Sequence, residues 1–191
     1  MFAYNHEVVE IKQNGARWKV KVVDTNNHSH EFESDYVINC AGLWSDKVAR
    51  MAGIDKYKIE FCKGEYWKAP RLKDKMNRLI YPLPSKNGLG IHTAVNLDGE
   101  ITFGPNAYFV PEINYRQTED WQNIFQAAAE RIVRFPGELH PDYTGIRPRY
   151  DKNEFHINED RLGFINLIGI ESPGLTSCLS IAEHVSKMIA N

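Results

Sequence analysis

A histidine within an apolar run is the first residue of this sequence whose type suits catalysis. His92 lies in "LGIHTAV", where the alternation of a strand places it on the same face as Gly90 and Ala94. These small neighbours leave open space beside the imidazole, and histidine is the natural base near neutral pH. His92 is therefore a candidate general base, and the alternative is a histidine that serves only the structure of its strand.

Arg147, in "GIRPRY", could bind an acidic substrate. A guanidinium group forms two parallel hydrogen bonds with a carboxylate, although Arg147 could equally be solvated or paired with Asp142 or Asp151. Tyr66 and Tyr81 place hydroxyl-bearing rings on predicted strands, with core packing as the alternative. These three side chains are the candidate substrate-binding residues.

Two turns contain residues small enough to admit a ligand. Ala41 and Gly42 follow the apolar run "YVINC", where they would let a ligand approach the backbone or a helix pack closely on a sheet. Ser172 and Pro173 predict the start of a helix, and the first amides of a helix attract anions. The alternative for this second turn is a helix start with no ligand.

Several catalytic motifs are missing from the sequence. A dinucleotide-binding GxGxxG does not occur, since the nearest pair, Gly88 and Gly90, precedes a strand-like run instead of following one. The sequence also lacks a GxxxxGK[ST] phosphate loop, a GxSxG elbow and an HExxH zinc motif. The sequence thus provides no phosphate-binding turn, serine-nucleophile motif or zinc-protease motif.

Composition narrows the class of protein further. The chain has 191 residues, of which 42% are apolar and 25% charged, as in ordinary globular proteins. A net charge of -2 without a basic block argues against a nucleic-acid partner. Three widely spaced cysteines argue against disulfides and a metal site, and no apolar run approaches the ~20 residues that span a membrane. We therefore expect a cytoplasmic protein without a transmembrane segment.

Hydrophobic periodicity predicts an α/β (α+β) fold in which two lobes are built from interleaved segments. Strands are predicted within residues 6–37 and 57–110, among them "HEFESDYVIN" at 30–39 and "NRLIYPL". An amphipathic helix is predicted at 118–134, with Thr118 as a possible N-cap and Trp121, Ile124, Phe125, Ala128 and Ile132 on one face. Strand-turn-helix units are predicted at 36–53 and 163–189, the second helix with a stripe that includes Ile181, Val185 and Met188. The unbroken apolarity of "YVINC" favours a strand covered on both faces. The predicted lobes are residues 1–56 with 140–191, and residues 57–139.

A family resemblance emerges when several segments are taken together. They are "DYVINCAGLWSDKVARMAG", "KGEYWK", "LIYPLP", "LGIHTAVNLDGEITFGPNA", "GIRPRY" and "GIESPGLTSCLSIAEHV". In this order they resemble the FAD-dependent oxidoreductases of the D-amino-acid oxidase superfamily, most closely the L-2-hydroxyglutarate oxidase or dehydrogenase group, over nearly the whole chain. The resemblance implies a partial Rossmann-like FAD-binding lobe and a substrate lobe with an antiparallel sheet that faces the flavin.

The resemblance also implies roles for particular residues. Ala41 and Gly42 would lie near the FAD, and the amides of Gly174, Leu175 and Thr176 would face the pyrimidine edge of the flavin, where a helix dipole stabilises negative charge. The implied reaction transfers hydride from a 2-hydroxy acid to the flavin while a base takes the hydroxyl proton. Oxygen or a quinone would then accept the electrons.

Two departures from the family qualify this expectation. The family begins with a strand, GxGxxG and a helix, which this sequence does not contain, and Lys63 replaces the arginine common before the glycine of "KGEY". We therefore expect the C-terminal portion of a flavoenzyme, inactive by itself, with an exposed sheet edge through which it could self-associate. The alternatives are a non-catalytic remnant or interaction module, or an amine or amino-acid oxidase. A cytoplasmic location peripheral to a membrane fits this group.

Overall fold

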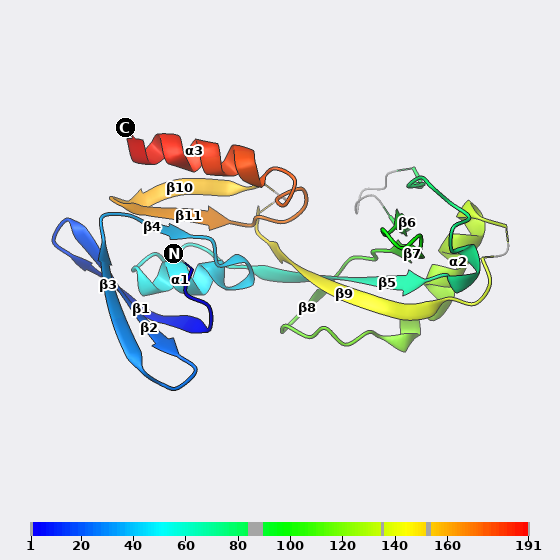
Figure 1. The fold of residues 1–191 in the computed structure, drawn as a ribbon, viewed down its shortest axis with the longest axis horizontal. Helices are drawn as coiled ribbons and strands as arrows, with labels where there is room; N and C mark the ends of the chain where they lie inside the picture. Colours follow the sequence, from blue (N-terminus) through cyan, green and yellow to red (C-terminus); the bar gives the residue numbers. More distant parts are fainter. Residues whose placement is uncertain (1, 84–89, 135, 152–153, 191) are drawn as a thin grey trace. The chain divides into compact units, whose positions relative to one another are not determined.

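A computed structural model of the protein describes residues 2–83, 90–134, 136–151 and 154–190 (Figure 1). The fold is mixed α/β, as predicted, and divides into two compact units. The first unit comprises Met1–Glu60 and Pro148–Asn191, and the second comprises Phe61–Arg147. The sequence analysis places the boundaries after residues 56 and 139, whereas the structure places them after residues 60 and 147.

The first unit contains two small sheets. The elements of the antiparallel sheet are β1 (His6–Asn14), β2 (Arg17–Asp24) and β3 (Ser29–Ser34). The other sheet has the order β10-β11-β4, formed by β10 (His156–Arg161), β11 (Phe164–Ile168) and β4 (Val37–Asn39), with β11 and β4 parallel. The segment 30–39, predicted as one strand, therefore divides between the two sheets.

The expectation that "YVINC" is covered on both faces is wrong. Ile38 is 43% exposed and Cys40 is exposed, while Asn39 between them is buried. β4 lies at the end of its sheet, so in the described part of the chain it pairs only with β11. The alternation of exposed Ile38 and Cys40 with buried Asn39 is that of a strand covered on one face, whereas β11 is buried along its whole length.

The helices of the first unit are short. The turn after β4 leads through η1 (Gly42–Trp44) into α1 (Ser45–Met51), and α3 (Cys178–Ala190) lies beside β10 and β11 (Figure 1). α3 buries Val185 against Ile165 and Leu167. These contacts join the helix to the buried strand that precedes it.

The helix predicted to begin at Ser172 begins instead at Cys178. Residues 172–177 form turns, in which the hydroxyls of Thr176 and Ser177 donate to the carbonyl oxygen of Pro173 at 2.9 and 3.1 Å. Such local side-chain hydrogen bonds compete with helix formation. The positive end of the helix dipole therefore lies at Cys178, beyond the residues for which the sequence analysis predicted it.

The second unit is built on a sheet of order β6-β7-β5-β8, with β9 pairing to β5. Its strands are β5 (Glu60–Lys68), β6 (His92–Val95), β7 (Ile101–Gly104), β8 (Tyr108–Val110) and β9 (His140–Arg149). Its helical elements are η2 (Pro70–Leu72), η3 (Glu119–Trp121) and α2 (Gln122–Ile132). The strand predicted in "NRLIYPL" is absent from the described residues of this sheet. Ile80 has one backbone hydrogen bond to β6, from the amide of Thr93, and its own amide donates to the hydroxyl of Thr93 instead of a carbonyl.

The core of the second unit lies between its sheet and α2. Phe125 and Ala129 of the helix are fully buried with Trp67 and Phe103 of the sheet. Ile124, predicted on the buried face, is 49% exposed. Residues 119–121 form a tighter 3-10 turn before α2, which rotates the buried stripe relative to that of a continuous helix from Thr118.

Candidate functional site

Two tyrosines form a stacked pair on adjacent strands of the second unit. The rings of Tyr66 on β5 and Tyr143 on β9 lie 4.3 Å apart at an interplanar angle of 15°. Burial raises the pKa of both phenols. Both phenols therefore stay protonated at neutral pH and act through hydrogen bonds.

Arg147 adds a positive charge to this pair. Burial raises the pKa of the Tyr66 phenol, and the positive charge of Arg147 opposes that rise. Arg147 follows Tyr143 by four residues on β9, so alternation places both on the same face. We call Tyr66, Tyr143 and Arg147 the tyrosine-arginine cluster.

His92 stacks on Tyr81 in the same unit. Their rings lie 4.2 Å apart at 21°, and Nδ1 of His92 lies 2.9 Å from the carbonyl oxygen of Gly90. Because a carbonyl oxygen only accepts, this hydrogen bond assigns the proton of the neutral imidazole to Nδ1 and leaves Nε2 as an acceptor. Such a tautomer suits a general base.

The four residues predicted for catalysis and substrate binding all lie in the second unit. His92, stacked on Tyr81, pairs with Gly104 of β7, and a Cβ added to Gly104 would lie 2.6 Å from the ring of Tyr66. Tyr143 was not predicted. The alternation of Tyr143, Gly145 and Arg147 along one strand is the signal that could have identified it.

In the first unit, the turn at Ala41 and Gly42 is held by a pair of buried asparagines. Asn39 and Asn166 face one another in the parallel register of β4 and β11, and Nδ2 of Asn39 donates to Oδ1 of Asn166 at 2.7 Å. Oδ1 of Asn39 accepts from the amide of Ala41 at 3.2 Å. The sequence analysis missed this pair, although "VIN" and "FIN" each place an asparagine at the same point of an apolar strand.

Asp160 completes this chain of hydrogen bonds. Its carboxylate accepts from Asn166 at 2.7 Å, from Tyr57 at 2.5 Å and from Lys56 at 2.7 Å. Burial acts to raise the pKa of Asp160, but the hydrogen bonds from Lys56, Tyr57 and Asn166 together lower it. The turn is therefore anchored to an ionised carboxylate through two neutral amides.

The conformation of Gly42 leaves room for a ligand. Its φ of +55° lies in the left-handed region that favours glycine, and a Cβ added there would meet no atom within 4 Å. A planar group could therefore approach the main chain at this turn.

The turn before α3 borders a hollow of about 350 Å³. Its lining residues are Ile170, Glu171, Ser172, Pro173, Leu175 and Thr176. The amide of Gly174 donates to the carbonyl oxygen of Glu171 at 2.5 Å, whereas the amides of Leu175 and Thr176 have no hydrogen-bond partner within the described ranges. These two amides are the donors that this turn offers to an electron-rich oxygen or nitrogen.

Comparison with known proteins places this geometry in a family. Residues 2–188 match the model described as FAD dependent oxidoreductase. The chain belongs to the FAD-dependent oxidoreductase family. The predicted resemblance and the FAD cofactor of this family are thereby confirmed.

Two curated family members are about equally similar in sequence. The mitochondrial L-2-hydroxyglutarate dehydrogenase of Arabidopsis thaliana is 30% identical over 97% of this chain and 45% of its own length. Glycerol 3-phosphate dehydrogenase of Caloramator mitchellensis is 30% identical over 98% of this chain and 39% of its own length. The chain therefore spans less than half the length of these two relatives.

Solved structures support the fold. The L-alpha-glycerophosphate oxidase of Mycoplasma pneumoniae, which has FAD bound, superposes with a TM-score of 0.80 at 22% identity, over 97% of this chain and 50% of that one. L-proline dehydrogenase of P. horikoshii superposes with a TM-score of 0.79 at 18% identity, over 96% and 49%. Across the described ranges, no helix combines the length and apolarity needed to cross a membrane.

The residues of the first unit fit a flavin. The amides of Leu175 and Thr176 supply donors that the carbonyl oxygens and ring nitrogens of a flavin accept, and the open space at Gly42 admits a flat ring. The donors are main-chain groups of a turn, so the fit does not need a helix beginning at Ser172.

Proposed function

We propose that the chain forms part of an FAD-dependent oxidoreductase that oxidises a small 2-hydroxy acid such as L-2-hydroxyglutarate. The observation that carries this proposal is the tyrosine-arginine cluster, in which the charge of Arg147 acts on the phenol of Tyr66 and the ring of Tyr66 stacks on that of Tyr143. A guanidinium binds a carboxylate with two hydrogen bonds, and a phenol hydroxyl can position the alcohol. The group is thus suited to a substrate that carries both.

The side chains of the second unit have separate tasks in this proposal. Arg147 binds the carboxylate, and Tyr66 and Tyr81 orient the substrate beside the imidazole. Nε2 of His92 takes the proton of the substrate hydroxyl, which makes the adjacent carbon a better hydride donor. FAD supplies the acceptor for that hydride, and the products are a 2-oxo acid and reduced cofactor.

The first unit has the cofactor-binding task in this proposal. Ala41 and Gly42 border the flavin, while Gly174, Leu175 and Thr176 contribute a turn whose main-chain donors face its polar edge. Preorganised donors of this kind stabilise the negative charge that develops during reduction. Oxygen or a quinone would then accept the electrons from the flavin. We place the protein in the cytoplasm, where it could associate with a membrane surface, or with a second copy of itself through the edge of β4.

Glycerol 3-phosphate is the second candidate substrate. The Caloramator enzyme named for it is as similar in sequence as the Arabidopsis enzyme named for L-2-hydroxyglutarate. Both molecules carry a secondary alcohol and an anionic group, and a guanidinium binds phosphate as well as carboxylate. An amino acid is a third candidate, since Arg147 would serve its carboxylate equally well.

Anaerobic flavin reduction distinguishes these candidates. The flavin-loaded protein that contains this chain is mixed in turn with L-2-hydroxyglutarate, glycerol 3-phosphate and L-proline, and the loss of visible flavin absorbance is followed. We expect rapid loss with L-2-hydroxyglutarate and little change with its D-enantiomer. Rapid loss with another compound alone would replace the proposed substrate, and a protein that binds no flavin would support a non-catalytic remnant.

A further inference from the structure

A buried ion pair lies beneath the tyrosine-arginine cluster. Lys63 and Glu65 are both buried, and Nζ of Lys63 lies 3.4 Å from Oε1 of Glu65. Both residues precede Tyr66 on β5, where alternation directs Glu65 and Tyr66 to opposite faces of the strand. Charges are costly to bury, so a pair in this position needs further partners.

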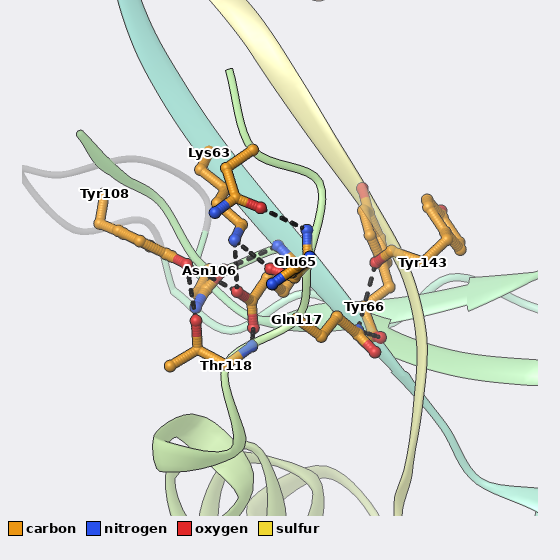
Figure 2. A network of polar contacts seen from close by, with 10 residues as sticks. Lys63, Glu65, Tyr66, Asn106, Tyr108, Gln117, Thr118 and Tyr143 are labelled. Atoms are coloured by element: carbon orange, nitrogen blue, oxygen red, sulfur yellow. Dashed lines mark hydrogen bonds and ion pairs between the residues drawn. The ribbon is translucent and has the colours of Figure 1, made fainter. Parts of the chain in front are cut away.

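Those partners all come from the segment 105–118 (Figure 2). Glu65 accepts from the hydroxyl of Tyr108 at 2.6 Å and from the amide of Thr118 at 3.4 Å. Lys63 donates to the carbonyl oxygen of Arg116, which immediately precedes Gln117. The ion pair therefore fixes both ends of a short stretch of chain around residue 117.

The backbone of β5 also holds this segment closely. The amide of Glu65 donates to Oδ1 of Asn106 at 2.8 Å. A Cβ added to Gly64 would lie 2.9 Å from Cβ of Pro105, closer than real side chains allow. Close approach and buried charge together leave the segment little freedom to move along the strand.

Gln117 connects this fixed segment to the tyrosine pair. Its Nε2 donates to the carbonyl oxygen of Tyr66 at 2.6 Å and to that of Tyr143 at 3.4 Å (Figure 2). One side chain thus spans β5 and β9 at the two residues whose rings stack. Arg147 lies four residues further along β9, on the same face as Tyr143.

We propose that Gln117, held in place by the buried Lys63–Glu65 pair, is a positioning residue for substrate binding. It fixes the spacing of Tyr66 and Tyr143 and thereby the direction in which Arg147 presents its guanidinium. This inference rests on the proposed function, because it assigns the tyrosine-arginine cluster to the substrate. Gln117 itself acts only through the two backbone carbonyls.

The test compares Gln117→Leu with a matched control in the flavin-loaded protein. Gln126→Leu is the control, since Nε2 of Gln126 also donates to a backbone carbonyl in the second unit, that of Gly137 at 3.0 Å. With L-2-hydroxyglutarate, Gln117→Leu is expected to raise KM about tenfold at nearly unchanged kcat, the signature of lost binding. Gln126→Leu is expected to change neither constant, and flavin content stays equal in both variants.

Two further variants keep the result interpretable. Gln117→Glu replaces the donating nitrogen with an oxygen while the side chain keeps its size. It is expected to raise KM about tenfold as well, and it serves as the test if Gln117→Leu does not fold. Combining Gln117→Leu with Arg147→Lys is expected to raise KM by less than the product of the single effects, because both changes act on one contact. The inference would be overturned if KM stayed unchanged in Gln117→Leu and Gln117→Glu, or if it rose equally in Gln126→Leu. It would also be overturned if the effects of Gln117→Leu and Arg147→Lys on KM simply multiplied in the double variant.

A spectroscopic readout separates this inference from the proposed function. Stacked tyrosines contribute to near-ultraviolet circular dichroism, so Gln117→Leu is expected to change that spectrum and Gln126→Leu to leave it unaltered. This difference is expected even if the wild-type protein oxidises no 2-hydroxy acid, a result that would reject only the proposed function. Identical near-ultraviolet spectra for Gln117→Leu and the wild type would reject the positioning role of Gln117.

Discussion

The tyrosine-arginine cluster and the turn before α3 differ in the groups with which they can bind a ligand. Tyr66, Tyr143 and Arg147 present side chains from two paired strands above a buried ion pair. Leu175 and Thr176 present main-chain amides from a turn whose hydrogen bonds are local, and the side chain of Leu175 is 88% exposed. Substitution should therefore impair the cluster readily, whereas the turn should tolerate any change that preserves its backbone.

The largest effect is expected when the buried ion pair under the tyrosine-arginine cluster is broken. Glu65→Leu leaves the ammonium of Lys63 buried without its partner, which typically costs about 3–5 kcal/mol of unfolding free energy. Urea unfolding of the two variants Glu65→Leu and Glu100→Leu measures the contrast. Glu100 pairs with Lys68 at 3.0 Å with about a third of each side chain exposed, so water solvates the charge that remains and Glu100→Leu should cost much less. Equal losses would show that the Lys63–Glu65 pair gives the cluster no special support.

The second effect concerns the proton acceptor. His92→Ala is expected to slow flavin reduction by roughly 100-fold, because the substrate hydroxyl loses its general base. Stopped-flow absorbance measures the rate, and His140→Ala serves as the control because His140 is an exposed residue at the start of β9. A rate for His92→Ala equal to that of the control would leave His92 with a structural role alone.

The smallest effect tests the turn. Leu175→Pro deletes one unpartnered amide and is expected to weaken FAD binding about tenfold, the value of roughly one hydrogen bond. Leu175→Ala keeps the amide, so FAD affinity should stay at the wild-type value. Titration of the apoprotein with FAD, followed by flavin fluorescence, measures both. Equal weakening in the two variants would mean that the Leu175 side chain, and not its amide, contributes to binding.

Strand alternation indicated His92 beside Gly90 and Ala94, and Arg147 was chosen for the carboxylate-binding geometry of its guanidinium; both roles stay predictions. The alternation of Tyr143, Gly145 and Arg147 could have identified Tyr143. Gln117 could not be identified in this way, because it acts from a loop on two backbone carbonyls and no pattern marks such a contact. The matching asparagines of "VIN" and "FIN" are visible in the sequence, but the contact between Asn39 and Asn166 depends on the register of strands that are distant in sequence.

The fold predictions failed where local chemistry altered an otherwise regular pattern. The periodicity of α3 was read correctly along Ile181, Val185 and Met188, but its beginning was placed too early. In the preceding turns the carbonyl of Pro173 accepts from the amide of Ser177 and from the hydroxyls of Thr176 and Ser177, while the amide of Gly174 donates to the carbonyl of Glu171. Helix ends depend on such single contacts, whereas helix faces depend on many residues together.

The most direct test of the account measures flavin affinity and substrate KM in Arg147→Met and Leu175→Pro side by side. The two regions are proposed to bind different molecules, so each variant should change one constant only. We expect Arg147→Met to raise the KM for L-2-hydroxyglutarate by about 100-fold while FAD affinity stays unchanged. Leu175→Pro should weaken FAD binding about tenfold while the KM stays unchanged. Loss of FAD in Arg147→Met, or a raised substrate KM in fully flavin-loaded Leu175→Pro, would contradict the account.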